Sequence, residues 1–288
     1  MGVPTGDDAA PTPRLRVGVI GDPIAHSLSP ALHQPALDAR GIPARYERWH
    51  TTAADLPARI ASLREPDALG ASVTVPHKLA TLSLVDEVAP SARAAGAVNT
   101  VINRNGRLIG ENTDVYGFAT SLAEACPDAD SRAALVLGAG GAARAVVLAL
   151  RDLGIARIVV AARDSEKAAL LGREVGVDVE AVSIDPDSLR AMLPTAGILV
   201  NATSLGWKAG EIPLPVESLA LLPERAIVAD LTYRDTDLLL AARERSLATL
   251  DGLGMLIHQG ARAFTLWTGQ PAPIEVMAAA AQAARANR

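Results

Sequence analysis

Short apolar runs alternate with longer amphipathic segments through most of the chain. Apolar runs of a few residues that end at glycine, proline or polar residues are typical of buried strands, whereas apolar positions three or four residues apart are typical of helices. Strands that alternate with helices predict an α/β fold with largely parallel sheets. The expected strands cover residues 16–20, 44–50, 70–75, 97–102, 108–110, 133–137, 158–162, 198–201 and 227–231.

Capping residues indicate where several of the expected helices begin and end. Ser29 is expected to cap the first helix, with Pro30 at its first helical position and Gly41 just past its end. Thr113 or Asp114 is expected to cap the helix that ends near residue 125. Further helices are expected over residues 55–63, 79–88, 255–267 and 275–284.

A chain of 288 residues suits about two domains. The first α/β domain is expected over residues 15–114 and is completed by residues 252–288, whereas residues 115–251 are expected to form the second domain. Residues 1–14 carry no signal-peptide pattern and are expected to form a flexible tail.

Composition narrows the kind of partner. A net charge of −5 gives no reason to expect a nucleic acid. No apolar run approaches the roughly 20 residues that a membrane-spanning helix needs. The single cysteine, Cys126, provides neither a disulfide framework nor a metal cluster. We therefore expect a cytoplasmic protein without a metal site, whose partner is a small molecule.

The expected strand at 133–137 is followed at once by a glycine-rich turn and a helix-forming run. Gly138, Gly140 and Ala143 fit the pattern G-x-G-x-x-A of a dinucleotide-binding βαβ unit. The pattern provides a sharp turn, a close approach of the backbone to a pyrophosphate, and a helix N-terminus whose N–H groups and dipole favour phosphates. The turn residues expected to contact the cofactor are Gly138, Ala139, Gly140, Gly141 and Ala142.

The next expected strand ends at Arg163, the position at which such folds select their cofactor. A basic residue there pairs with the extra phosphate of NADP, whereas an acidic residue hydrogen-bonds the ribose hydroxyls of NAD. Arg163 therefore favours NADP, and Lys167 can support it one turn further on. Asp164 lies between them, so NAD stays open as the cofactor, and a plain solvated loop is the alternative interpretation.

Hydroxyl side chains gather near the ends of two N-terminal strands. Ser27 and Ser29 precede the first helix, and Ser72 alternates with apolar residues so that it shares one strand face with Thr74. Capping alone explains the first two serines. Hydroxyls beside a helix N-terminus at a strand end also form a polar corner of the kind that binds ligands in open α/β sheets.

Eight short strings in this order resemble the shikimate dehydrogenase family over nearly the whole chain. The strings are HSLSP, SVTVPHK, AVNT, ENTD, GAGGAAR, NATSLG, DLTY and GMLIHQGA. The resemblance implies a substrate-binding α/β domain, a Rossmann-like NADP domain, and C-terminal helices that return to the first domain. It also implies reversible NADPH-dependent reduction of 3-dehydroshikimate to shikimate by a monomer or homodimer.

The resemblance assigns roles to individual residues. Hydride transfer between an alcohol carbon and a nicotinamide requires a proton to join or leave the oxygen, and Lys78 is the implied general acid, oriented by Asp114. Ser27 and Ser29 are implied to hold the substrate carboxylate. Further implied substrate residues are Thr74, Asn99, Tyr233 and Gln259, and further implied cofactor residues are Thr203 and Gly252.

Some residues depart from the family pattern. Ser72 stands where Asn is usual, in the implied substrate pocket, and Gly260 stands where Ala is usual. Trp207 occupies a loop position that often carries Met or another apolar residue. Ala162 and Asp164 replace the Asn and Thr of a phosphate-binding string.

Two other functions stay open. A quinate or quinate/shikimate dehydrogenase that uses NAD would share these strings, because quinate differs by one hydroxyl at the ring carbon that bears the carboxylate. A non-catalytic dinucleotide sensor would keep the glycine turn and lose the proton-transfer residues. The presence of both Lys78 and Asp114 argues against the sensor.

Overall fold

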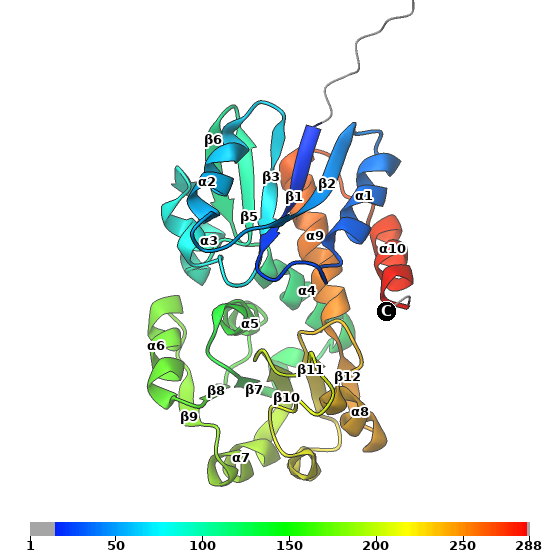
Figure 1. The fold of residues 1–288 in the computed structure, drawn as a ribbon. Coiled ribbons are helices and arrows are strands. Elements are labelled where there is room, and N and C mark those ends of the chain that lie inside the picture. Colours follow the sequence, from blue (N-terminus) through cyan, green and yellow to red (C-terminus); the bar gives the residue numbers. More distant parts are fainter. Residues whose placement is uncertain (1–14, 287–288) are drawn as a thin grey trace, which may run out of the picture.

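The computed structural model describes residues 15–286 and has the predicted α/β fold, with two six-stranded sheets. We call the half built on the N-terminal sheet the first lobe and the half built on the other sheet the second lobe; Figure 1 shows the first above the second. The tail expected over residues 1–14 lies outside the described residues. The division into domains at residues 114 and 251 stays a prediction.

The sheet of the first lobe mixes parallel and antiparallel neighbours. Its strands are β1 (Leu15–Gly21), β2 (Ala44–His50), β3 (Ala68–Val73), β4 (Glu87–Val88), β5 (Thr100–Arg104) and β6 (Arg107–Glu111), in the spatial order β2-β1-β3-β5-β6-β4. β1 runs parallel to β2 and β3, whereas β5 runs antiparallel to β3 and β6. The β5–β6 hairpin turns at Asn105 and Gly106, whose φ angles of 53° and 88° suit a two-residue type I′ turn.

Helices cover both faces of this sheet. On one face lie α1 (Ser29–Ala39), α9 (Gly252–Thr268) and α10 (Ile274–Ala286), and on the other lie α2 (Leu56–Ala61) and α3 (Pro90–Ala95). Val17 and Val19 of β1 pack in one buried cluster with Phe264 and Trp267 of α9. The C-terminal helices therefore belong to the core of the first lobe, as predicted.

The sheet of the second lobe is entirely parallel over its described strands. These are β7 (Ala133–Leu137), β8 (Ile158–Ala162), β9 (Glu180–Ser183), β10 (Ala196–Asn201), β11 (Ile227–Asp230) and β12 (Ala248–Leu250), in the order β12-β11-β10-β7-β8-β9. Val136 packs into the core on one face of the sheet and Leu135 into the core on the other, so β7 is buried on both faces. The order reverses beside β7, where open α/β sheets bind their ligands.

The helices of the second lobe follow its strands in turn. They are α5 (Gly141–Asp152), α6 (Ser165–Val175), α7 (Pro186–Met192) and α8 (Asp237–Glu244). α4 (Asp114–Ala125) leads from the first sheet to the second, and α9 leads back. The two connecting helices pack closely, since a Cβ added at Gly117 would lie 2.8 Å from Cβ of Gln259.

Two local predictions are wrong. The helix expected over 79–88 is only a 3₁₀ turn at Ala80–Ser83 followed by β4. Asp86 accepts a hydrogen bond from the backbone N–H of Leu108 at 2.7 Å, and this contact draws the segment to the edge of the sheet. Ser29 is the first residue of α1 and does not cap it, whereas the hydroxyl of Ser27 accepts from the N–H of Ser29 at 3.2 Å.

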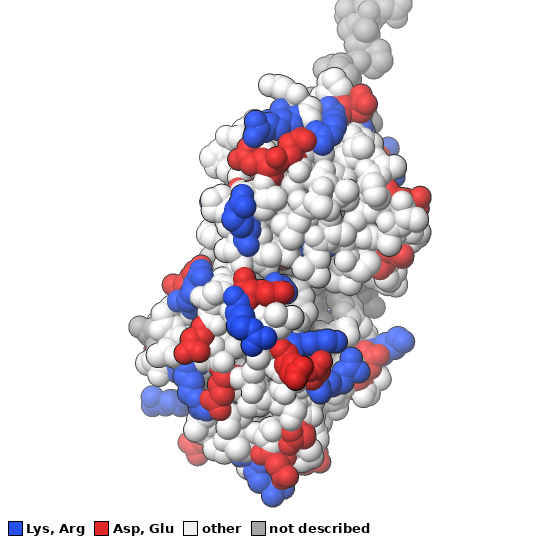
Figure 2. All heavy atoms as spheres, turned by 90° about the vertical axis from the view of Figure 1, so that its left-hand side faces the viewer, with Lys and Arg blue, Asp and Glu red and all other residues white. Residues whose placement is uncertain are grey.

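The described part of the chain holds no helix long and apolar enough to cross a membrane, and no group of three or more acidic, histidine or cysteine side chains arranged to hold a metal. Figure 2 shows that basic and acidic side chains are interspersed over the face that it presents. This face therefore does not carry the single-sign charge that a polyanion partner would need.

Candidate active site

Lys78 and Asp114 form an ion pair in the first lobe. The distance from Nζ to Oδ2 is 2.6 Å, and the two side chains are 18% and 8% exposed. Lys78 follows β3 in a loop that is held from both sides, because its carbonyl accepts from the N–H of Val98 at 2.9 Å and His77 Nε2 lies 2.6 Å from the carbonyl oxygen of Thr51. The ammonium group is thus presented from a fixed backbone.

Asp114 is the first residue of α4. Its carboxylate does not cap the helix, because the side chain of Asn112 accepts the hydrogen bonds of the first helix N–H groups. Oδ1 of Asn112 accepts from the N–H groups of Asp114 and Val115 at 3.0 and 3.4 Å. The carboxylate of Asp114 is therefore available to side chains, and it accepts from Asn99 Nδ2 at 2.8 Å as well as from Lys78. An interpretation of Asp114 as a helix cap is wrong.

Asn99 is the centre of a buried network that positions this carboxylate. Its Nδ2 also donates to Oγ1 of Thr113, and its Oδ1 accepts from the N–H of Thr113 at 2.8 Å and from Oγ1 of Thr100 at 3.0 Å. Thr113 in turn donates to Oε1 of Gln259 at 3.4 Å. Four of the predicted site residues, which lie before or after strands of the first sheet and on α4 and α9, are thus joined by a continuous chain of contacts.

The predicted serine corner lies at the N-terminus of α1. Ser27 Oγ donates to Ser29 Oγ at 3.1 Å, and Ser29 is buried. The guanidinium of Arg48 donates to the carbonyl of Ser27 at 2.9 Å, so a positive charge lies close to the corner. Thr74 follows β3 and is half-buried. Hydroxyls and a cation beside a helix N-terminus suit an anion.

Tyr233 connects the two lobes. It follows β11, yet its hydroxyl donates to the carbonyl of His26 in the first lobe at 3.1 Å. Its ring meets that of Trp207 edge-on, with centroids 5.3 Å apart. The loop that carries Trp207 therefore packs against the loop that carries Tyr233.

The glycine turn after β7 has the geometry that its sequence predicts. Gly138 has a φ of 105°, and an added Cβ would lie 3.1 Å from the carbonyl oxygen of Ala202. An added Cβ at Gly140 or Gly141 would meet no atom within 4 Å, so the N-terminus of α5 faces open space. Ala143 is fully buried against the sheet.

The loop after β8 is more than a solvated connection. Oδ1 of Asp164 accepts from the N–H of Glu166 at 3.0 Å and caps α6. This structural role accounts for an acidic residue between Arg163 and Lys167, both of which are exposed. The other two predicted cofactor residues are internally bonded or packed: Thr203 donates to Oδ1 of Asn201 at 2.7 Å, and Gly252 lies tight against the backbone of Leu231.

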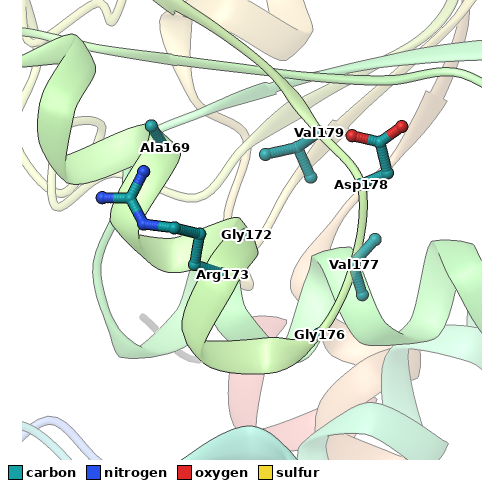
Figure 3. Close-up of a pocket in the computed structure, with 7 residues that line it drawn as sticks. All are labelled: Ala169, Gly172, Arg173, Gly176, Val177, Asp178 and Val179. Atoms are coloured by element: carbon teal, nitrogen blue, oxygen red, sulfur yellow. The ribbon is translucent and has the colours of Figure 1, made fainter.

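A separate cavity of about 280 Å³ lies between α6 and the edge strand β9 (Figure 3). It is lined by Ala169, Gly172, Arg173, Gly176, Val177, Asp178 and Val179. No residue predicted to bind substrate or cofactor lines it, so the cavity forms no part of the candidate active site.

Three family models match successive parts of the chain. The shikimate dehydrogenase substrate binding domain matches residues 19–101, the shikimate / quinate 5-dehydrogenase model matches 121–207, and the shikimate 5'-dehydrogenase C-terminal domain matches 252–282. A shikimate dehydrogenase (NADP(+)) of Symbiobacterium thermophilum is 45% identical over 275 residues, which are 93% of this chain and 94% of the relative. The chain belongs to the shikimate dehydrogenase family.

Solved structures of the shikimate dehydrogenase family agree with the fold. The enzyme from Thermus thermophilus in complex with NADP(H) and shikimate is 41% identical, with a TM-score of 0.81 over 94% of this chain and 99% of that one. Quinate dehydrogenase from Corynebacterium glutamicum in complex with NAD is 32% identical, with a TM-score of 0.83 over 94% and 99% of the two chains. Both chemistries of the family therefore occur on this fold.

The residues that organise the candidate site were less visible in the sequence than the residues expected to react. Asn112, Thr113 and Thr100 hold Asn99 and Asp114 in place, as described above. An asparagine two residues before an expected helix start was the available signal for Asn112, because such side chains often accept from helix N–H groups. The contacts of Thr100 and Thr113 depend on strand pairing, which no short motif encodes.

Proposed function

We propose that this member of the shikimate dehydrogenase family catalyses the reversible NADPH-dependent reduction of 3-dehydroshikimate to shikimate. The observation that carries the proposal is the buried pair of Lys78 and Asp114, held by Asn99 and set among hydroxyl and amide side chains. The curated relative from Symbiobacterium thermophilum and the ternary complex from Thermus thermophilus support it.

Ser27 and Ser29 bind the substrate carboxylate in this proposal. Their oxygens are 3.1 Å apart at the N-terminus of an 11-residue helix, whose amides and dipole favour an anion. The ring hydroxyls are held by Thr74, Asn99 and Gln259, with Tyr233 facing the substrate from the second lobe. Each of these side chains offers a donor or an acceptor.

Lys78 moves the proton. In the reducing direction its Nζ donates a proton to the carbonyl oxygen that becomes the alcohol, and in the oxidising direction it takes the proton back. Its positive charge also stabilises the negative charge that develops on this oxygen. Asp114 fixes Nζ at 2.6 Å, and Asn99 fixes Asp114, so the donor is held in place before substrate binds.

NADPH supplies the hydride when it is bound, and the residues present fit a dinucleotide. The open space over Gly140 and Gly141 leaves the N-terminus of α5 accessible to a pyrophosphate. Arg163 and Lys167 pair with the additional phosphate of NADP. The full proposed set is Gly138, Ala139, Gly140, Gly141, Ala142, Arg163, Lys167, Thr203 and Gly252.

We further propose a cytoplasmic enzyme that works as a monomer or a homodimer. A single polypeptide carries both the serine corner and the Lys78–Asp114 pair, so the proposed site needs no second copy. Light scattering coupled to size-exclusion chromatography measures the assembly directly.

Initial rates with shikimate and with quinate, each against NADP and NAD, test the function. We expect the highest kcat/KM for shikimate with NADP. A higher value for quinate with NAD would replace the proposal with the activity of the Corynebacterium relative. Absence of turnover with all four pairs would favour a dinucleotide sensor.

A further inference from the structure

Asp230, the last residue of β11, carries a buried carboxylate whose hydrogen bonds all lie within the second lobe. It is 1% exposed. Its Oδ1 accepts from the N–H and from the hydroxyl of Thr232, both at 2.9 Å, and its Oδ2 accepts from Nδ2 of Asn201 at 2.9 Å and from the hydroxyl of Thr236 at 3.0 Å. A carboxylate offers about four acceptor sites, so these four neutral donors occupy it fully. Asp230 therefore holds protein groups and not a ligand.

Asn201 lies directly opposite Asp230 at the end of the neighbouring strand, β10. Its Oδ1 accepts from the N–H and the hydroxyl of Thr203 at 3.1 and 2.7 Å, and its Nδ2 also donates to the carbonyl of Leu205 at 3.0 Å. We call residues 202–211 the β10 loop. The side chain of Asn201 thus shapes the start of this loop, and Asp230 holds that side chain.

The loop after β11 is attached to the same carboxylate on both sides of Tyr233. We call residues 231–236 the β11 loop. Thr232 precedes Tyr233 and Thr236 follows it, and both hydroxyls donate to Asp230. The carbonyl of Thr232 also accepts from the N–H of Gly252 at 2.9 Å, so the start of α9 is attached to this loop as well.

The two loops also meet further from the strands. The guanidinium of Arg234 donates to the carbonyl of Trp207, and the rings of Trp207 and Tyr233 pack edge-on. The β10 loop passes close to the carboxylate at Gly206, where an added Cβ would lie 3.5 Å from Oδ2 of Asp230. The β10 and β11 loops therefore form one connected structure, with Asp230 at its buried end.

We propose that Asp230 is a positioning residue that fixes the β10 loop against the β11 loop. It thereby sets the separation between Thr203, which is proposed to bind the cofactor, and Tyr233, which is proposed to face the substrate. This inference rests on the proposed function. Hydride transfer requires the nicotinamide and the substrate carbon to be held in a productive geometry, and a misplacement of about 1 Å can lower the rate about 10²-fold.

Asp230→Asn tests this role, because it keeps the shape of the side chain and replaces one acceptor oxygen by an amide donor. The N–H of Thr232 points at one oxygen and Nδ2 of Asn201 points at the other, so the new amide group faces a donor in either orientation. Asn201 keeps its own orientation, because its Oδ1 accepts from the N–H of Thr203. Unsatisfied buried donors are costly, so we expect the two loops to shift apart.

The first measurement is the initial rate of shikimate oxidation by Asp230→Asn. We expect kcat to fall about 10²-fold, the cost of a displacement of about 1 Å between reacting groups. KM for shikimate should rise, because Tyr233 is displaced. KM for NADP should change far less, because the glycine turn and Arg163 are untouched. A role in stability alone would leave kcat and both KM values of the folded protein unchanged.

The second measurement is iodide quenching of tryptophan fluorescence, which reports on the β10 loop without any turnover. The chain has three tryptophans, of which Trp49 and Trp267 are 7% and 4% exposed and Trp207 is 42% exposed. Iodide in solution therefore reaches Trp207 in preference to the other two. We expect stronger quenching in Asp230→Asn than in the wild type, because Trp207 loses its packing against the β11 loop.

Two further variants complete the test. Thr232→Val removes one hydroxyl donor from Asp230 and keeps the charge, so it should show the same changes at a smaller magnitude, and it decides the role if Asp230→Asn does not fold. Asp128→Asn is the matched control, because the same atom is exchanged in an exposed carboxylate that precedes β7 and pairs with Arg132. It should leave the kinetics and the quenching unchanged.

Unchanged kcat and unchanged quenching in the folded Asp230 and Thr232 variants would overturn the inference, and so would equal losses in Asp128→Asn. If wild-type protein does not oxidise shikimate, the proposed function fails and positioning for that reaction fails with it. If wild-type protein is active and the variants match it, only the inference about Asp230 fails.

Discussion

Nζ of Lys78 lies 2.6 Å from Oδ2 of Asp114, although 36 residues separate them in the chain. One residue follows a strand and the other opens a helix, and the sheet between them determines their distance. Two charges at this separation and with this burial interact far more strongly than exposed ion pairs do. In the proposed mechanism, the pair gives the first lobe a proton donor that is fixed before any ligand is present.

Replacement of Lys78 by Met removes the ammonium and keeps much of the side-chain length. We expect kcat to fall by about 10²–10⁴-fold, which is the usual contribution of a positioned acid or base. KM for NADP should not change, because the glycine turn is in the other lobe. Steady-state kinetics in the shikimate-oxidising direction measure both values. A variant that keeps kcat within tenfold of the wild-type value would exclude Lys78 as the general acid.

We expect opposite effects on stability and on cofactor binding when Gly140 and Gly138 of the turn are each replaced by Ala. In Gly140→Ala the added Cβ meets no atom within 4 Å and the residue keeps a negative φ, so the free energy of unfolding should stay equal to that of the wild type. KM for NADP should rise about tenfold, because the methyl group blocks the approach of the pyrophosphate. Gly138→Ala forces a side chain into a φ of 105° and should lower the unfolding free energy by about 1–3 kcal/mol. Urea unfolding together with cofactor titration separates the two effects. Equal effects of both variants on KM and on stability would contradict this assignment.

Arg163→Ser tests the choice of cofactor. We expect kcat/KM with NADP to fall about 10–100-fold, the scale of a lost hydrogen bond to a charged group, and kcat/KM with NAD to change far less. Lys167→Ala should have a smaller effect, because Nζ of Lys167 lies 4.0 Å from Oδ2 of Asp164 and is partly neutralised by it. A parallel loss with both cofactors would show that Arg163 does not bind the additional phosphate.

The buried side chain of His33 should make the free energy of unfolding depend on pH. Burial lowers its pKa from 6.5 to about 3, so the unfolded chain binds a proton between these pH values that the folded protein does not bind. Stability from this residue is present above pH 6.5 and is lost as the pH falls toward 3, by about 1.4 kcal/mol per pH unit. Urea unfolding at about pH 7 and about pH 5.5, on either side of the ordinary histidine pKa, should show a smaller loss for His33→Leu than for wild type. An equal loss of unfolding free energy in wild type and in His33→Leu would show that His33 does not cause the pH dependence.

The sequence was most informative where a short stretch of chain determines the geometry. The glycine turn at 138–141 depends on neighbouring residues and has the predicted form, and the tight turn at Asn105 and Gly106 is equally local. The segment 79–88 has an apolar pattern typical of a helix, yet Asp86 is drawn to β6 by a contact with Leu108. Local propensity was overridden there by pairing with a strand that comes later in the chain.

In the candidate site, too, the sequence indicated the features that depend on a short stretch of chain and missed those that depend on contacts between distant segments. The resemblance of short strings to the family implied the roles of Lys78 and Asp114, and the position of the two serines beside a helix start gave them an independent reason to bind an anion. The hydrogen bond of Tyr46 to Ser72 joins β2 and β3, and no pattern within either strand predicts it. The helix start at Asp114 was predicted within one residue, but which side chain caps it depended on the placement of Asn112.

The packing of Phe264 and Trp267 against Val17 and Val19 also bears on how the protein is made. During translation β1 is synthesised first and α9 and α10 last. One face of the first sheet therefore stays partly uncovered until translation is nearly complete. The second lobe, whose strands and helices are contiguous, can bury its own apolar faces earlier. Gln259 is synthesised with these last helices, so a chain whose translation stalls before residue 252 would carry every strand of the second lobe, but its first lobe would lack α9, α10 and Gln259.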